Sequence, residues 1–146
     1  MPNYMQYPLT PTEASYLKEV YELVKDGTPV PPIALSRAFG VSRVSSMEML
    51  RKLEAKGYGE YWPRRGLALN ESGKRTAEAL IRKHRLFECL IFEKLGVPRA
   101  DVCCEAGQVD RFLSDSLATR MEDALGHPDT CPCGKPISTS PARKGA

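Results

Sequence analysis

Apolar residues recur three or four positions apart in several parts of the chain, which is the spacing of an amphipathic helix. The first run begins at Thr10-Pro11-Thr12-Glu13, which offers a capping threonine, a proline for the first helical position and a glutamate three residues after the cap. It ends at Asp26-Gly27. A second run extends from Pro31-Pro32 to Gly40, and a third from Ser42 to Gly57. We therefore expect three helices here.

The third run and the segment after it carry different patterns. The apolar positions of the third run are Val44, Met47, Leu50 and Leu53, and we expect these four side chains to face the core. After Gly57, short segments rich in Tyr, Trp and Leu flank a turn sequence, Pro63-Arg64-Arg65-Gly66. This pattern predicts a β-hairpin with a basic turn.

A long helix is predicted from about Asn70 to Gly96, and two shorter helices at about 101–112 and 114–125. Beyond Gly126 the sequence is rich in turn residues, and 138–146 is expected to be a flexible tail. The fold class is therefore mainly α. The order helix, helix, turn, helix, hairpin is that of a winged helix-turn-helix, in which the third helix enters the major groove of DNA.

Charge supports an interaction with DNA. The formal net charge of the 146 residues is only +3, but 12 Lys or Arg and 5 Asp or Glu lie between Leu35 and Arg85. A basic segment beside mildly acidic ones suits a polyanionic partner, whereas a solvated helical surface is the alternative interpretation. The expected contacts combine the start of the third helix with the hairpin turn. They are Ser42, Arg43, Ser45, Ser46, Glu48, Arg64 and Arg65.

Composition narrows the class of protein. With 42% hydrophobic and 27% charged residues, the chain has an ordinary globular composition. It shows no apolar run of about 20 residues and no secretory signal, so we expect a cytoplasmic protein with no membrane partner. No nucleophile triad pattern, phosphate-binding loop or paired catalytic carboxylates are visible, and we expect no enzymatic activity.

Several short motifs follow one another in the order found in a known family. They are Leu9-Thr10…Glu13…Tyr16-Leu17, Val20-Tyr21-Glu22-Leu23, Arg65-Gly66-Leu67-Ala68-Leu69, Arg82-Lys83-His84-Arg85-Leu86-Phe87-Glu88, Val102…Glu105-Ala106, Ser114-Asp115 and Cys131-Pro132…Gly134-Lys135-Pro136-Ile137. With these motifs the chain resembles the iron- and manganese-dependent repressors of the diphtheria-toxin-repressor type. The resemblance implies a winged-helix DNA-binding domain at 1–74 and a helical dimerisation and metal-sensing domain at 75–137. A third, SH3-like domain is not expected, because the chain ends too soon.

The resemblance also implies where metal would bind, and the chain departs from it. The positions of the family's regulatory ligands are Ser15, Gly107, Asp110 and Arg111. Glycine has no ligand atom and arginine does not deprotonate, so we expect that the usual regulatory site is not built. A second family site is partly retained as His84, Glu88 and Cys103. The alternative is that His84 is an interhelical hydrogen-bonding residue and Glu88 its solvated partner.

Five cysteines suggest a different sensor. Cys131-Pro132-Cys133-Gly134 is a tight loop with two thiols, and Cys103-Cys104 supplies two more near a helix start, where thiolates are favoured. Four thiolates suit zinc or an iron–sulfur cluster. Adjacent cysteines on a helix point about 100° apart, so only one of Cys103 and Cys104 need be a ligand. Cys89 lies in an apolar run and is expected in the core.

We therefore expect a homodimeric DNA-binding regulator of metal or iron homeostasis, acting as a repressor at a palindromic operator. Its DNA affinity is expected to depend on a cysteine-rich centre of Cys103, Cys104, Cys131 and Cys133, with His84 and Glu88 as further ligands. An iron–sulfur cluster is the favoured cofactor, and Zn²⁺ or Fe²⁺ are the alternatives. Two other hypotheses remain: a thiol-redox switch without a cofactor, and a regulator with structural zinc only.

Overall fold

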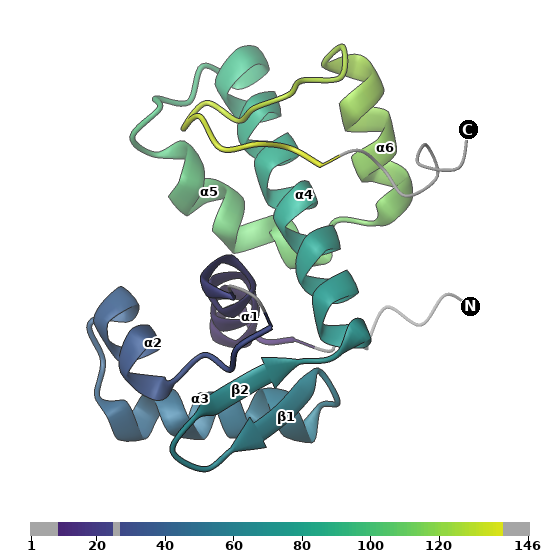
Figure 1. Ribbon diagram of the computed structural model, residues 1–146. Helices are drawn as coiled ribbons and strands as arrows, with labels where there is room; N and C mark the ends of the chain where they lie inside the picture. Colours follow the sequence, from purple (N-terminus) through teal and green to yellow (C-terminus); the bar gives the residue numbers. More distant parts are fainter. Residues whose placement is uncertain (1–8, 25–26, 139–146) are drawn as a thin grey trace. The chain divides into compact units, whose positions relative to one another are not determined.

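The computed structural model describes residues 9–24 and 27–138 (Figure 1). The chain divides into two compact units, Met1–Glu78 and Ala79–Ala146, compared with an expected domain boundary after Lys74. The expected flexible tail lies outside the described residues except for its first residue, Ser138. Within the described part of the chain, no helix is both long and apolar enough to cross a membrane.

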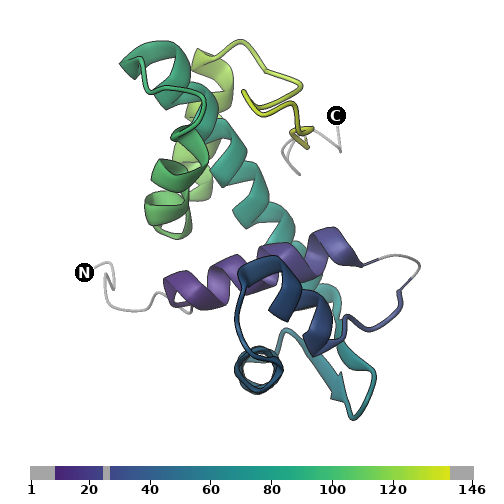
Figure 2. The same ribbon diagram turned by 90° about the vertical axis from the view of Figure 1, so that its left-hand side faces the viewer.

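The first unit contains the three predicted helices. They are α1 (Pro11–Leu23), α2 (Pro32–Phe39) and α3 (Arg43–Ala55). Thr10 caps α1 by accepting a hydrogen bond from the Glu13 amide, and Ser42 caps α3 in the same way. The turn between α2 and α3 depends on Gly40, whose φ of 65° lies in the left-handed region. Helices α1 and α2 both pack against α3 (Figure 2).

The buried face of α3 differs from the predicted one. Ser46, Leu50 and Leu53 are fully buried, whereas Val44 is 61% exposed, so the expectation that Val44 faces the core was wrong. Residues two positions apart on a helix point about 200° apart around its axis. When Ser46 faces the core, Val44 therefore faces solvent. The Ser46 hydroxyl lies 3.5 Å from the Tyr16 hydroxyl of α1, which satisfies a buried polar group at this helix crossing.

The predicted hairpin is present as β1 (Gly59–Trp62) and β2 (Gly66–Leu69), which pair antiparallel from Gly59↔Leu69 to Trp62↔Gly66. Val30 adds an isolated antiparallel bridge to Leu67, which fixes β2 against the segment before α2. Gly66 has a φ of 108°, and a Cβ atom there would lie 1.9 Å from the carbonyl oxygen of Val30. Only glycine fits this close approach.

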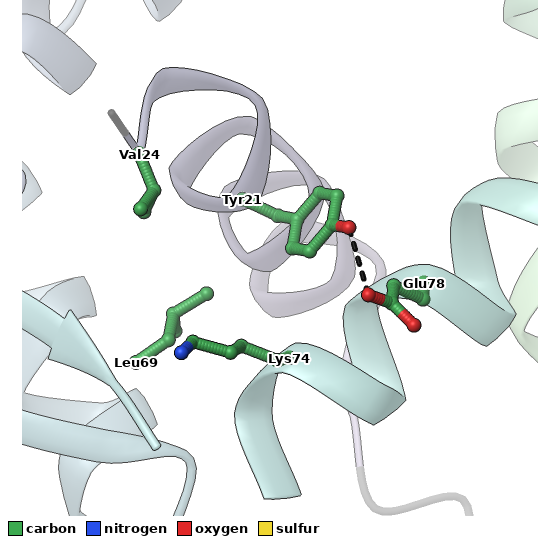
Figure 3. Close-up of a pocket in the computed structure, with 5 residues that line it drawn as sticks. All are labelled: Tyr21, Val24, Leu69, Lys74 and Glu78. Carbon is green, nitrogen blue, oxygen red and sulfur yellow. Dashed lines mark hydrogen bonds between the residues drawn. The ribbon is translucent and has the colours of Figure 1, made fainter. Parts of the chain in front are cut away.

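Residues of α1, β2 and the start of α4 line an open pocket in the first unit (Figure 3). The lining residues are Tyr21, Val24, Leu69, Lys74 and Glu78. The Tyr21 hydroxyl donates a 2.8 Å hydrogen bond to Glu78 Oε1, which ties α1 to α4 within this unit. We interpret the pocket as a result of packing within the unit, because the polar groups of Tyr21 and Glu78 that line it bond to each other.

The second unit is helical. It contains most of α4 (Glu71–Leu95), then α5 (Val102–Val109), the 3₁₀ helix η1 (Asp110–Phe112) and α6 (Asp115–Ala124). Leu86 of α4 and Ala118 and Met121 of α6 form its apolar core. A buried ion pair between Arg82 and Glu122 also joins α4 to α6. The segment 127–137 returns along the second half of α4 (Figure 1).

Candidate metal centre and nucleic-acid interface

Two potential metal ligands project from one face of α4. His84 and Glu88 are four residues apart, so they lie one above the other on the helix. His84 Nε2 is 2.6 Å from Glu88 Oε1, and only 3% of Glu88 is exposed. A buried carboxylate is costly unless it is paired, so this side chain needs a cationic or donor partner.

Asp110 orients the histidine. The fully buried carboxylate of Asp110, in η1, accepts a hydrogen bond from His84 Nδ1 at 2.8 Å. With Nδ1 hydrogen-bonded to Asp110, Nε2 faces Glu88, to which it donates when the ring carries both protons and offers a lone pair when the ring is neutral. A carboxylate behind a histidine in this way is the usual arrangement at protein metal sites, because it fixes the tautomer and the ring orientation.

Cys103 completes a first set of donors. Its sulfur, on the first turn of α5, lies 3.5 Å from His84 Nε2. One ligand atom each of His84, Glu88 and Cys103 lie within 4.8 Å of one another. The packing of α5 on α4 thus brings together His84 and Cys103, which are 19 residues apart in the sequence.

The C-terminal loop supplies a second set. One ligand atom each of Glu88, Cys131 and Cys133 also lie within 4.8 Å of one another. The loop is a tight turn, in which the Gly134 amide bonds to the Cys131 carbonyl and the Cys131 amide to the Lys135 carbonyl. Glu88 therefore belongs to both sets.

Side chains of α4 contact this loop directly. The Arg85 guanidinium donates to the Pro136 carbonyl at 2.6 Å, and the Cys89 thiol donates to the Thr130 carbonyl at 3.6 Å. Both residues flank Glu88 in sequence. The two thiols of the loop are consequently placed beside the carboxylate by contacts that no ligand has to supply.

The ionisation of these groups reflects their proximity. Burial acts to raise the pKa of Glu88, but its hydrogen bond and charge interaction with His84, and then the Cys131 and Cys133 thiols, outweigh burial and lower the pKa. Desolvation and the negative charges of Glu88, Cys131 and Cys103 raise the pKa of Cys133. Burial raises the pKa of Cys89 to about 11, so Cys89 is a protonated core thiol, as expected.

The start of α3 and the hairpin turn form the candidate DNA surface. Ser42, Arg43, Ser45 and Glu48 are exposed there. Ser42 is engaged in capping, accepting from the Ser45 amide at 3.0 Å. Ser46 is fully buried, so the expectation that it contacts DNA is corrected: in this packing its hydroxyl faces Tyr16. Val44 is exposed in its place.

The hairpin turn presents two exposed arginines. Arg64 has a φ of 68°, which is uncommon for a residue with a side chain. The guanidinium of Arg65 lies over the Trp62 ring, 5.5 Å from its centre. Both charges therefore sit at the tip of a wing, as the sequence predicts.

Comparison with known proteins identifies the family. Residues 8–67 match the N-terminal DNA binding domain of iron dependent repressors, and residues 70–139 match their metal binding and dimerisation domain. The chain belongs to the iron-dependent repressor family. The resemblance and the winged helix-turn-helix fold predicted from the sequence are confirmed.

Individual relatives of the iron-dependent repressor family agree with this assignment. Iron-dependent repressor IdeR of Mycobacterium tuberculosis is 30% identical over 129 residues, which are 88% of this chain and 56% of the relative. A manganese-dependent transcriptional repressor in complex with manganese has a TM-score of 0.73 at 31% identity, covering 88% of this chain and 59% of that one. ScaR with bound Zn²⁺ has a TM-score of 0.68 at 28% identity, covering 87% and 59%. The chain thus spans a little over half the length of these relatives, which are repressors rather than enzymes by name.

Not all of the expected metal ligands lie close together in the part of the chain that the structure describes. Cys104 is exposed and belongs to neither set of donors, because its neighbour Cys103 takes the direction that faces His84. A centre of four cysteines is therefore not formed. The donors are three thiols, one imidazole and one carboxylate. This donor set fits divalent cations such as Zn²⁺ or Fe²⁺ better than an iron–sulfur cluster.

The positions of the family's regulatory ligands have other contacts in this member. The Ser15 hydroxyl donates to the Pro11 carbonyl, and Arg111 donates to the Gln108 carbonyl and lies over the Phe112 ring. Gly107 has no side chain, and Asp110 bonds to His84. The role of Asp110 as partner of the histidine was missed by sequence reasoning. A carboxylate opposite a histidine on separate helices carries no local signal.

Proposed function

We propose that the chain is a homodimeric transcriptional regulator, a repressor, whose affinity for a palindromic DNA operator is set by a divalent metal ion. The observation that carries this proposal is the convergence of His84, Cys103 and the Cys131–Cys133 loop on one buried carboxylate, Glu88. This convergence lies in the region that matches a metal binding and dimerisation domain. As part of this proposal, the regulator would act in the cytoplasm, where its operator lies.

The DNA-binding side of the proposal rests on the first unit. Exposed Arg43, Ser45 and Glu48 occupy the first turns of α3, where their side chains can meet a phosphate or a base edge. The exposed Val44 side chain adds an apolar surface suited to a thymine methyl group. In a dimer, two such helices would meet successive major grooves about 34 Å apart, which is why a palindromic operator is expected.

The ion would be held by neutral His84, ionised Glu88 and thiolates. It would supply positive charge where several negative groups lie together, and would lower the cost of ionising the thiols. The candidate ligands come from α4, α5 and the loop, so metal binding would fix these three parts of the sensing unit against one another. Zn²⁺ and Fe²⁺ both accept such mixed donors, and the relatives include an iron-dependent repressor, a manganese-dependent repressor and a structure of ScaR with bound Zn²⁺.

The test measures DNA affinity with and without metal. The full chain is stripped with a chelator and titrated against operator candidates selected from random duplexes, with and without Zn²⁺ or anaerobic Fe²⁺. We expect tighter binding by at least tenfold with metal for the natural chain, and no metal response for Glu88→Gln. The control Glu105→Gln changes an exposed acid of α5 and should respond normally. Equal DNA affinity with and without metal would overturn the proposal.

A thiol-redox switch is the second candidate, because Cys103 and Cys133 are exposed and lie close enough for their charges to interact. It predicts that a metal-free chain responds to peroxide and recovers with a dithiol reductant. The response would disappear in Cys133→Ser and persist in Cys104→Ser. A metal-free chain whose DNA affinity ignores peroxide excludes it.

A further inference from the structure

The five donors around Glu88 do not form one group. They fall into two sets, and each set is compact: His84, Glu88 and Cys103 in one, and Glu88, Cys131 and Cys133 in the other, each within 4.8 Å. Two donors of a single ion lie no more than about 4.6 Å apart, twice a zinc–sulfur bond of about 2.3 Å. Because the five atoms together are not within such a range, one ion would have to leave some of them unbound.

Glu88 is built to serve both sets. One of its oxygens, Oε1, is 2.6 Å from His84 Nε2. The other, Oε2, is buried and has no hydrogen-bond partner of ordinary geometry among the described residues. The carboxylate also interacts with the thiols of Cys131 and Cys133. A buried carboxylate oxygen without a good donor is unfavourable, and a cation beside it would remove that cost.

We propose that the centre binds two metal ions bridged by the Glu88 carboxylate, one on His84 and Cys103 and the other on Cys131 and Cys133. This inference rests on the proposed metal-dependent function and extends it to stoichiometry. A bridging carboxylate gives one oxygen to each ion and holds two ions about 3.5–4 Å apart. Water or a donor of a second copy completes each shell.

The two positions differ in their preference for metals. The first has one imidazole, one carboxylate oxygen and one thiolate, which suits several divalent cations. The second has two thiolates and a carboxylate oxygen, and thiolates select zinc or cobalt over manganese. We therefore expect Zn²⁺ and Co²⁺ to fill both positions and Mn²⁺ to fill at most the first.

The test counts ions on the full chain. Chelator-treated, reduced protein is dialysed against Zn²⁺ or Co²⁺ and analysed by elemental analysis against protein concentration, without DNA. Two ions per chain are expected for the natural protein, and one for Cys133→Ser and for His84→Ala. Cys104→Ser is the matched control, because it removes the neighbouring thiol that belongs to neither set, and it should retain two.

Cobalt spectroscopy tests the bridge itself. Adding Co²⁺ to the natural chain should give thiolate-to-cobalt absorption, and the paramagnetic resonance signal per cobalt should fall as the second ion binds, because bridged ions couple. In Glu88→Ala the signals of any bound ions should be additive. Saturation at one ion, or two ions with additive signals in the natural chain, would overturn the proposal. Either result leaves metal-dependent DNA binding, which is measured separately, intact.

Discussion

The carboxylate of Asp110 receives a 2.8 Å hydrogen bond from His84 Nδ1, so a residue in a position that the family uses for regulatory metal here supports a histidine. This contact fixes the imidazole with Nε2 toward Glu88 and Cys103. Asp110 is fully buried and belongs to neither set of donors, so it would act on an ion bound as proposed only through His84.

Replacing Asp110 tests this support. Asp110→Asn keeps the volume but offers an amide in place of the accepting carboxylate. We expect metal affinity at the His84 position to fall by roughly 10–100-fold, the usual effect of losing such a partner. Competition with a chromophoric chelator measures it, and Asp115→Asn, an exposed acid of α6, is the control. Equal affinities for the two variants would show that the histidine is positioned by packing alone.

Thiol labelling distinguishes the five cysteines. Cys104 is exposed and should be alkylated whether or not metal is present. Zn²⁺ should protect Cys103 and Cys133, the two exposed donors. Cys89, 3% exposed and with a pKa raised to about 11 by burial, should react only in the unfolded chain. Mass spectrometry after brief alkylation at about pH 7.5 reads each site. If Zn²⁺ protected Cys104 from alkylation as well as it protects Cys103, the assignment of donors to the two sets would be contradicted.

The wing can be tested through the backbone of Arg64. Arg64→Gly removes the charge at a φ of 68° that glycine adopts without strain. We expect weaker binding to all DNA sequences and a shallower dependence on salt, by about one unit in the log–log slope, with stability retained. Arg64→Ala should lose the same contact but keep the backbone strain of the arginine, because both residues carry a Cβ at this φ. Unchanged salt dependence in Arg64→Gly would remove the wing from the interface.

Glu13 makes the first unit sensitive to acid. Its carboxylate lies 2.5 Å from Lys56 Nζ, and its side chain is only 6% exposed. Burial acts to raise the pKa of Glu13, but the hydrogen bonds and charge of Lys56, with help from Thr10, outweigh burial and lower the pKa below 4.5. The unfolded chain then binds more protons, so the stabilisation present above about pH 4.5 is lost as pH falls through the folded pKa.

Denaturant unfolding at several pH values between about 3 and 6 measures this effect. The natural chain should lose unfolding free energy as pH falls, whereas Glu13→Gln should be less stable near neutral pH and show a shallower slope. Glu19→Gln, on the same helix, is a suitable control. If Glu13→Gln retained the full slope, the acid sensitivity would belong to other groups.

Local patterns were sufficient to predict the elements of the fold. The capping signals at Thr10 and Ser42 place two helix starts where the structure has them, and the helix expected from about 114 begins after Ser114, its cap. Glycines just after the apolar runs of α2, α3, α4 and α6 place their ends to within two residues, whereas α1 ends at Leu23, before Gly27. The register of α3 was not predictable in the same way. Leucine and valine at helical spacing favour one face, but a small serine fits against Tyr16 and a valine does not have to be buried.

The sequence predicted the types of residue in the candidate metal centre, but only part of the set of residues that come together there. His84 and Glu88 share a helix face by spacing alone, and the thiols of Cys131 and Cys133 lie in one loop. The sequence does not show that this loop docks on α4, because the docking depends on contacts of Arg85 and Cys89 with carbonyl groups. For the same reason the choice of Cys103 over Cys104 required the orientation of α5.

The anchoring of the loop by Arg85 and Cys89 bears on how fast the centre can exchange its ions. Because these contacts do not involve the ligands, loss of an ion does not oblige the loop to unfold, and rebinding does not wait for it to fold. If metal binds there as proposed, exchange would be limited by proton release from the thiols and by ligand substitution at the metal. The chain would then follow a changing metal supply on the time scale of chemistry at the ion.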